Sequence, residues 1–91
     1  MTLLDILKEN LPEGAVVKQE KELPNRYKYC FEFDGETVNG EIVKTVSPGY
    51  EKSYVVNAIA TMMSQIYSKK GDMEKMLYWL EIAQKRDMGS N

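Results

Sequence analysis

The side chains that most often carry out catalysis are scarce in this chain. It contains no histidine and a single cysteine, Cys30. The commonest general base near neutral pH and the commonest metal ligand are therefore missing, and neither a Cys–His pair nor a structural zinc site can form. Cations can activate a thiol, and Arg26 and Lys28 precede Cys30 at alternate positions. We nevertheless expect Cys30 to be an ordinary small residue on a half-exposed strand.

Six carboxylates form the second candidate for chemistry. They lie in the segment that we assign below to strands: Glu20, Glu22, Glu32, Asp34, Glu36 and Glu41. Paired carboxylates perform acid–base catalysis only in a cleft that favours their protonated form, whereas these residues alternate with lysines. Their spacing matches no calcium loop, and the chain has no glycine-rich phosphate loop. We predict a non-catalytic protein without cofactor or metal, and a small enzyme that uses neither histidine nor metal is the alternative.

Composition limits the kind of protein further. A length of 91 residues gives one domain, 1–91, with a modest core. The net charge is −2 and the basic residues are scattered, so we expect no nucleic-acid surface and no membrane surface. One cysteine cannot form an internal disulfide, which favours a reducing compartment such as the cytoplasm. The N-terminus lacks the features of a signal peptide, and no stretch approaches the ~20 apolar residues of a membrane span.

The longest regular pattern is a helix predicted over 48–70. Ser47 is placed to cap it, Pro48 suits the first helical position, and Gly71 can take the left-handed conformation that ends it. Its apolar residues recur every three to five positions: Tyr50, Tyr54, Val55, Ala58, Ile59, Met62, Met63, Ile66 and Tyr67. One face of this helix must therefore be buried.

A second helix is predicted over 72–87, with Asp72 as its cap. We expect its inner stripe to contain five residues: Met73, Met76, Leu77, Leu80 and Ala83. Because the turn before it is so short, the two helices must pack antiparallel.

This helical hairpin resembles one tetratricopeptide repeat. The spacing of Tyr67, Gly71 and Ala83 matches that pattern over about a third of the chain. The chain departs from the pattern at five positions: Ala60, Ser64, Met76, Leu80 and Met88. The resemblance implies a groove that binds peptides. Such arrays need about three repeats to bury a continuous core, so convergence on a helical hairpin is the alternative.

The strongest strand signal is Arg26–Phe33, where aromatic residues alternate with polar ones. Asp34-Gly35 is a typical two-residue hairpin turn, and the next strand is predicted over Glu36–Val46. The turn sets a register in which Gly40 faces Tyr29 and leaves room for its ring. A slip by one residue would move the apolar side chains to the wrong face, which makes this register the favoured one.

Two weaker elements complete the chain. A short helix is predicted over 2–11, because Thr2 and Asp5 have capping-box spacing. A polar edge strand is predicted at the start of the sheet, which extends over 15–46. The fold class is therefore α+β: a short N-terminal helix, a three-stranded antiparallel meander, and a C-terminal antiparallel helical hairpin packed on the aromatic face of the sheet.

The candidate interface lies on the C-terminal hairpin. Tyr78, Trp79 and Ile82 fall outside the predicted inner stripe, and exposed Trp and Tyr often dominate protein interfaces. Met62 and Met63 are added, because adjacent methionines cannot both face one partner and methionine makes adaptable surfaces. The alternatives are that the N-terminal helix covers the Trp79 flank and that the methionines fill the core.

These observations predict a small cytoplasmic protein-binding module, an adaptor or an inhibitor of a larger partner. Small phage-encoded modulators of host proteins offer an analogy. A homodimer through the last helix is compatible with this prediction. The alternative is nucleic-acid binding by bases stacked on Tyr27, Tyr29 and Phe31, which requires a bare aromatic face and is opposed by the acidic balance.

Overall fold

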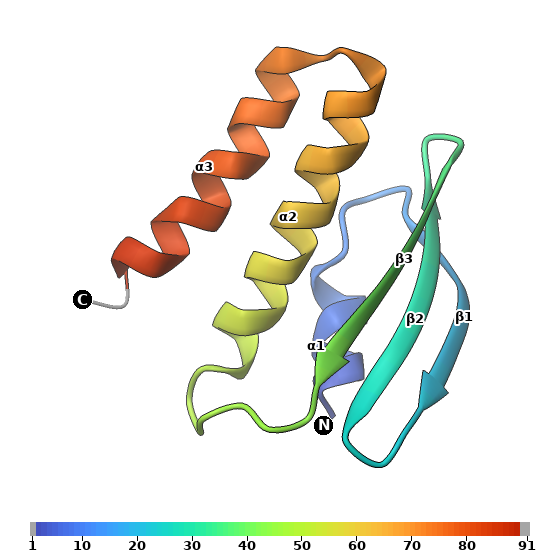
Figure 1. Ribbon diagram of the computed structural model, residues 1–91, viewed down its shortest axis with the longest axis vertical. Helices are drawn as coiled ribbons and strands as arrows, with labels where there is room; N and C mark the ends of the chain where they lie inside the picture. Colours follow the sequence, from blue (N-terminus) through green and yellow to red (C-terminus); the bar gives the residue numbers. More distant parts are fainter. Residues whose placement is uncertain (1, 90–91) are drawn as a thin grey trace.

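The fold is that of a computed structural model, which describes residues 2–89, with side chains up to Gln84. It has the predicted α+β order of a helix, a meander and two helices (Figure 1). The elements are α1 (Leu3–Asn10), β1 (Val16–Glu22), β2 (Arg26–Phe33), β3 (Glu36–Val43), α2 (Glu51–Lys70) and α3 (Met73–Gly89).

Helix α1 begins with the predicted capping box. The Thr2 hydroxyl accepts a hydrogen bond from the Asp5 backbone N–H, and the Asp5 carboxylate accepts one from the Thr2 backbone N–H. Leu3, Leu4 and Leu7 are buried, and α1 packs against α2. The predicted capping box is thus present, and α1 buries an apolar face.

The β2–β3 hairpin has the predicted register. Asp34 and Gly35 both adopt positive φ, at 51° and 80°, as a type I′ turn requires. Tyr29 pairs with Gly40 and Tyr27 with Ile42, so the aromatic rings and Ile42 share one buried face. Strand β3 ends at Val43 rather than at the predicted Val46, because its ladder partner β2 begins at Arg26, opposite Val43.

Strand β1 contains a bulge that the sequence did not reveal. Val17 pairs with Phe31 and Gln19 with Cys30, so Lys18 is the additional residue. After the bulge the alternation shifts, and Glu20 and Glu22 fall on the helix side of the sheet. Lys8 of α1 and Lys44 pair with these two carboxylates, which stabilises the edge strand in this register.

Helix α2 begins at Glu51, so the predicted start at Pro48 with a Ser47 cap is wrong. The Tyr50 N–H donates to the Ser47 carbonyl, and Gly49 has a φ of 90°. Pro followed by a glycine with positive φ forms a type II turn, which redirects the chain before the helix begins. Pro48 therefore belongs to this turn and not to the first helical turn.

The junction between α2 and α3 follows prediction. Gly71 has a φ of 76° and donates to Ser68, while the Asp72 N–H donates to the Tyr67 carbonyl, as in a Schellman motif. The Asp72 carboxylate then accepts from the Lys75 N–H and caps α3.

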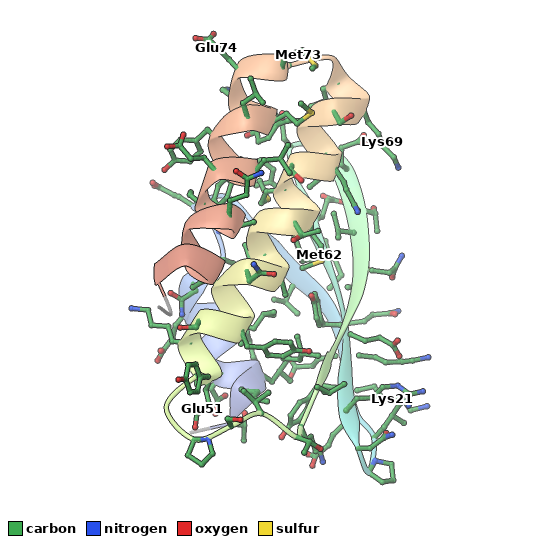
Figure 2. All side chains as sticks on the ribbon, turned by 60° about the vertical axis from the view of Figure 1, so that its left-hand side comes forward. Lys21, Glu51, Met62, Lys69, Met73 and Glu74 are labelled. Atoms are coloured by element: carbon green, nitrogen blue, oxygen red, sulfur yellow. The ribbon has the colours of Figure 1, made fainter. Side chains whose placement is uncertain are left out.

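Helix α2 is the centre of the molecule. In both views it lies between the sheet and α3, so the hairpin covers the sheet with α2 as the inner layer (Figures 1 and 2). The apolar side chains that are completely buried come from α1, the sheet and α2: Leu7, Phe31, Ile42, Val55, Ala60 and Met63. Helix α3 is consequently the outermost element and packs chiefly on α2.

Candidate protein interface on helix α3

One face of α3 is held against α2 by both packing and polar contacts. Met76 and Trp79 pack on the hydrophobic core and are half-buried. The Asn57 side chain donates to the Ala83 carbonyl at 3.0 Å, and the Lys75 ammonium lies 5.4 Å from the centroid of the Tyr67 ring. These contacts fix the rotation of α3 about its own axis.

That rotation corrects the predicted inner stripe. Met73 and Leu77 were assigned to it, yet they are 57% and 58% exposed. On α2, small buried residues, Ala60 and Ser64, lie between Asn57 and Tyr67 at helical spacing. Such residues let two helices approach closely. On α3, Trp79 is half-buried against the core, whereas Leu77 is exposed.

The predicted interface residues of α3 differ in their exposure. Tyr78 is 60% exposed, whereas Trp79 and Ile82 are half-buried. The Tyr78 and Trp79 rings meet edge to face, with centroids 5.4 Å apart. The two rings are thus in contact, and Tyr78 is the more exposed of the two residues.

The two methionines lie elsewhere. Met63, one of the predicted interface residues, is completely buried and offers no surface to a partner in this fold. Met62 is half-buried over the sheet, with its sulfur 3.2 Å from the Tyr29 hydroxyl (Figure 2). Adjacent helix positions point about 100° apart, and here one direction leads to the core and the other to the sheet.

Among the exposed residues of α3, five lie along its solvent side: Met73, Glu74, Leu77, Tyr78 and Glu81. We call this set the outer α3 surface. Figure 2 shows Met73 and Glu74 at the end of α3 next to the turn, on the side of the molecule far from Lys21 and the sheet. Sequence analysis missed Met73, Leu77 and the two glutamates. The spacing of Glu74, Leu77, Tyr78 and Glu81 was the available signal, since it places them along one helical ridge.

A second exposed surface is the face of the sheet opposite the helices. An open hollow of about 550 Å³ lies there, lined chiefly by Gln19, Lys21, Lys28, Cys30, Asn39 and Glu41. Figure 2 shows Lys21 projecting from this face, away from α2 and α3. Arg26 and Lys28 approach Glu41, at 2.7 and 4.0 Å. The carboxylate is therefore held by cations, and Cys30 is half-buried beside it.

A metal site, a perturbed titratable group or a membrane-spanning helix would point to another function for the described part of the chain. Its side chains include no group of three His, Cys, Asp or Glu residues that could hold a metal ion. Burial raises the pKa of the Tyr29 hydroxyl above its ordinary value, but this group is packed under Met62. Among the described helices none is both long and apolar enough to cross a bilayer.

The aromatic face of the sheet is buried. Tyr27, Tyr29 and Phe31 are covered and belong to the core. Bases cannot stack on these rings while the helices are in place, so the predicted mechanism of nucleic-acid binding is not open to this fold.

Comparison with known proteins places the chain in no family. No protein-family model matches it, and no significant match is found among curated proteins or solved structures.

Proposed function

We propose that this protein is a non-catalytic module that binds another protein through the outer α3 surface. The observation that supports the proposal is the exposure of three large apolar side chains, Met73, Leu77 and Tyr78, on the outermost helix. Contiguous exposed apolar surface is often a site of interaction. Met and Tyr are also enriched at interfaces, where Tyr offers a large area at low entropic cost.

The expected role is that of an adaptor or of an inhibitor of a larger protein, in the cytoplasm. A surface on an outer helix supports either role, because a partner can bind it without disturbing the core. The analogy with phage-encoded modulators of host proteins belongs to the inhibitor reading. The resemblance of the hairpin to a tetratricopeptide repeat implies a groove that binds peptides, which agrees with a protein-binding role.

The test is site-specific cross-linking in the source cell. A photoreactive residue in place of Leu77 is expected to capture one protein, whereas the same residue at Thr61 or Lys21 is not. Both control positions are exposed, Thr61 on α2 and Lys21 on the sheet. Capture should be lost when Tyr78→Glu is added.

The Tyr78→Glu protein must be shown to fold, by an unfolding curve that matches that of the wild type. Equal capture from all three positions, or none from Leu77, would reject the outer α3 surface as the binding site.

A further inference from the structure

The centre of the outer α3 surface has the form of a socket. Glu74, Leu77, Tyr78 and Glu81 occupy positions i, i+3, i+4 and i+7, and all four are exposed. Four residues at this spacing form the hole into which one side chain of a facing helix inserts. Here the two middle members are apolar and the two end members are acidic.

The charge of this socket selects the class of partner. Each carboxylate lies about one turn from the apolar pair, on opposite sides along the axis. An apolar side chain can sit over Leu77 and Tyr78 while Lys or Arg residues one turn away reach Glu74 and Glu81. The stems of such residues also cover apolar surface, and their heads interact with aromatic rings. Among the side chains of α3 that the structure describes, the one cation is that of Lys75, and it lies over the Tyr67 ring.

A second copy of the chain fits the socket less well. If two α3 helices cross antiparallel over Leu77 and Tyr78, Glu74 of one copy faces Glu81 of the other. If they run parallel, each glutamate faces its own counterpart. Both arrangements bring like charges together, which is destabilising.

We infer that the outer α3 surface binds a basic amphipathic helix, with an apolar residue in the socket and cations facing Glu74 and Glu81. This inference rests on the proposed function and adds the chemistry of the partner. It assigns the two glutamates to recognition of the partner. It also predicts a preference for basic over acidic helices, which should be reversed when the charge of the glutamates is reversed.

The test uses two synthetic helical peptides that differ only in charge. One carries Lys-Ala-Ala-Leu-Leu-Ala-Ala-Lys repeats, and the other has Glu in place of every Lys. We expect the basic peptide to bind about tenfold more tightly at low salt and to perturb backbone amide signals of residues 74–81. The preference should weaken as salt is added, because these ion pairs are exposed.

A charge reversal provides the decisive comparison. Glu74→Lys/Glu81→Lys should prefer the acidic peptide. The matched control is Glu9→Lys/Glu13→Lys, which changes the net charge equally at two other exposed positions and should keep the preference for the basic peptide. A preference that follows net charge in both variants would overturn the inference.

The remaining outcomes separate the two proposals. Equal binding of both peptides at 74–81, or no binding of either, overturns the basic helix as partner, while cross-linking from Leu77 still supports a protein interface. A concentration-dependent dimer that Leu77→Glu abolishes would identify a second copy as the occupant, and so would also overturn it. Failure of the cross-linking itself rejects the proposed function.

Discussion

At the scale of single residues, Gly40 shows how the residue type at one position can be dictated by a side chain that is distant in the sequence. A Cβ atom there would lie 2.5 Å from the Tyr29 hydroxyl oxygen and 3.0 Å from the Met62 sulfur. Glycine is therefore required by the ring that crosses it, as the register predicted, and not by the local backbone, since Gly40 is not among the residues with positive φ.

Replacing Gly40 should destabilise the protein through this contact. We expect Gly40→Ala to lower the free energy of unfolding by about 1–3 kcal/mol, because the Tyr29 ring must move. Urea denaturation measures the change. In a Tyr29→Leu background the same substitution should cost much less, and an equal cost in both backgrounds would show that Tyr29 is not the cause.

The capping box of α1 should be sensitive to pH. Hydrogen bonds from the backbone and the hydroxyl of Thr2 lower the pKa of the Asp5 carboxyl below its ordinary value of 3.8. Its contribution is thus present above pH 3.8 and is lost as the pH falls through the lower folded pKa. The difference in unfolding free energy between wild type and Asp5→Asn should therefore shrink as the pH is lowered from about 5 to about 2. A difference independent of pH would contradict this.

At the scale of elements, the rotation of α3 decides which of its residues can bind a partner. Periodicity alone assigned Met73 and Leu77 to the inside, because a helix with apolar residues on several sides has no unique inner face. The contacts of Asn57 and Tyr67 with α3 select another rotation. Trp79 then supports the fold, while its neighbour Tyr78 remains exposed.

Substitution of Trp79 and of Tyr78 should show that the first stabilises the fold and that the second does not. Trp79→Ala is expected to lower the free energy of unfolding by about 2–3 kcal/mol, since a half-buried indole leaves a gap against the core. Tyr78→Ala should change it by less than about 1 kcal/mol, because the ring is mostly exposed. Chemical denaturation of both variants checks the assignment, and the opposite order would mean that α3 is rotated differently.

At the scale of the whole molecule, burial decreases from the centre outward. Helix α2 is covered by the sheet, α1 and α3, whereas α3 packs chiefly on α2. A layer that is covered on one side has fewer contacts to lose on opening. This arrangement leaves one side of α3 exposed while the core stays covered.

Hydrogen exchange should reveal this order. Amides in the middle of α2 are expected to exchange more slowly than those in the middle of α3, because α3 can open without disrupting the sheet. Measurement under native conditions at low denaturant gives the free energy of each opening. Equal values in both helices would show that they open as one cooperative unit.

The sequence by itself determined the features that depend on near neighbours. The alternation in β2, the Asp34-Gly35 turn and the caps at Thr2, Gly71 and Asp72 involve contacts within a few residues or a period of two. The turn at Pro48 and Gly49 is local as well, and the sequence prediction misassigned it to the start of the helix. Tertiary structure decided the bulge at Lys18 and the rotation of α3. Both depend on contacts with segments that are distant in the sequence, so no local pattern specifies them. The candidate site falls in the second group: its residue types were visible in the sequence, but packing against α2 decided which of them face the solvent.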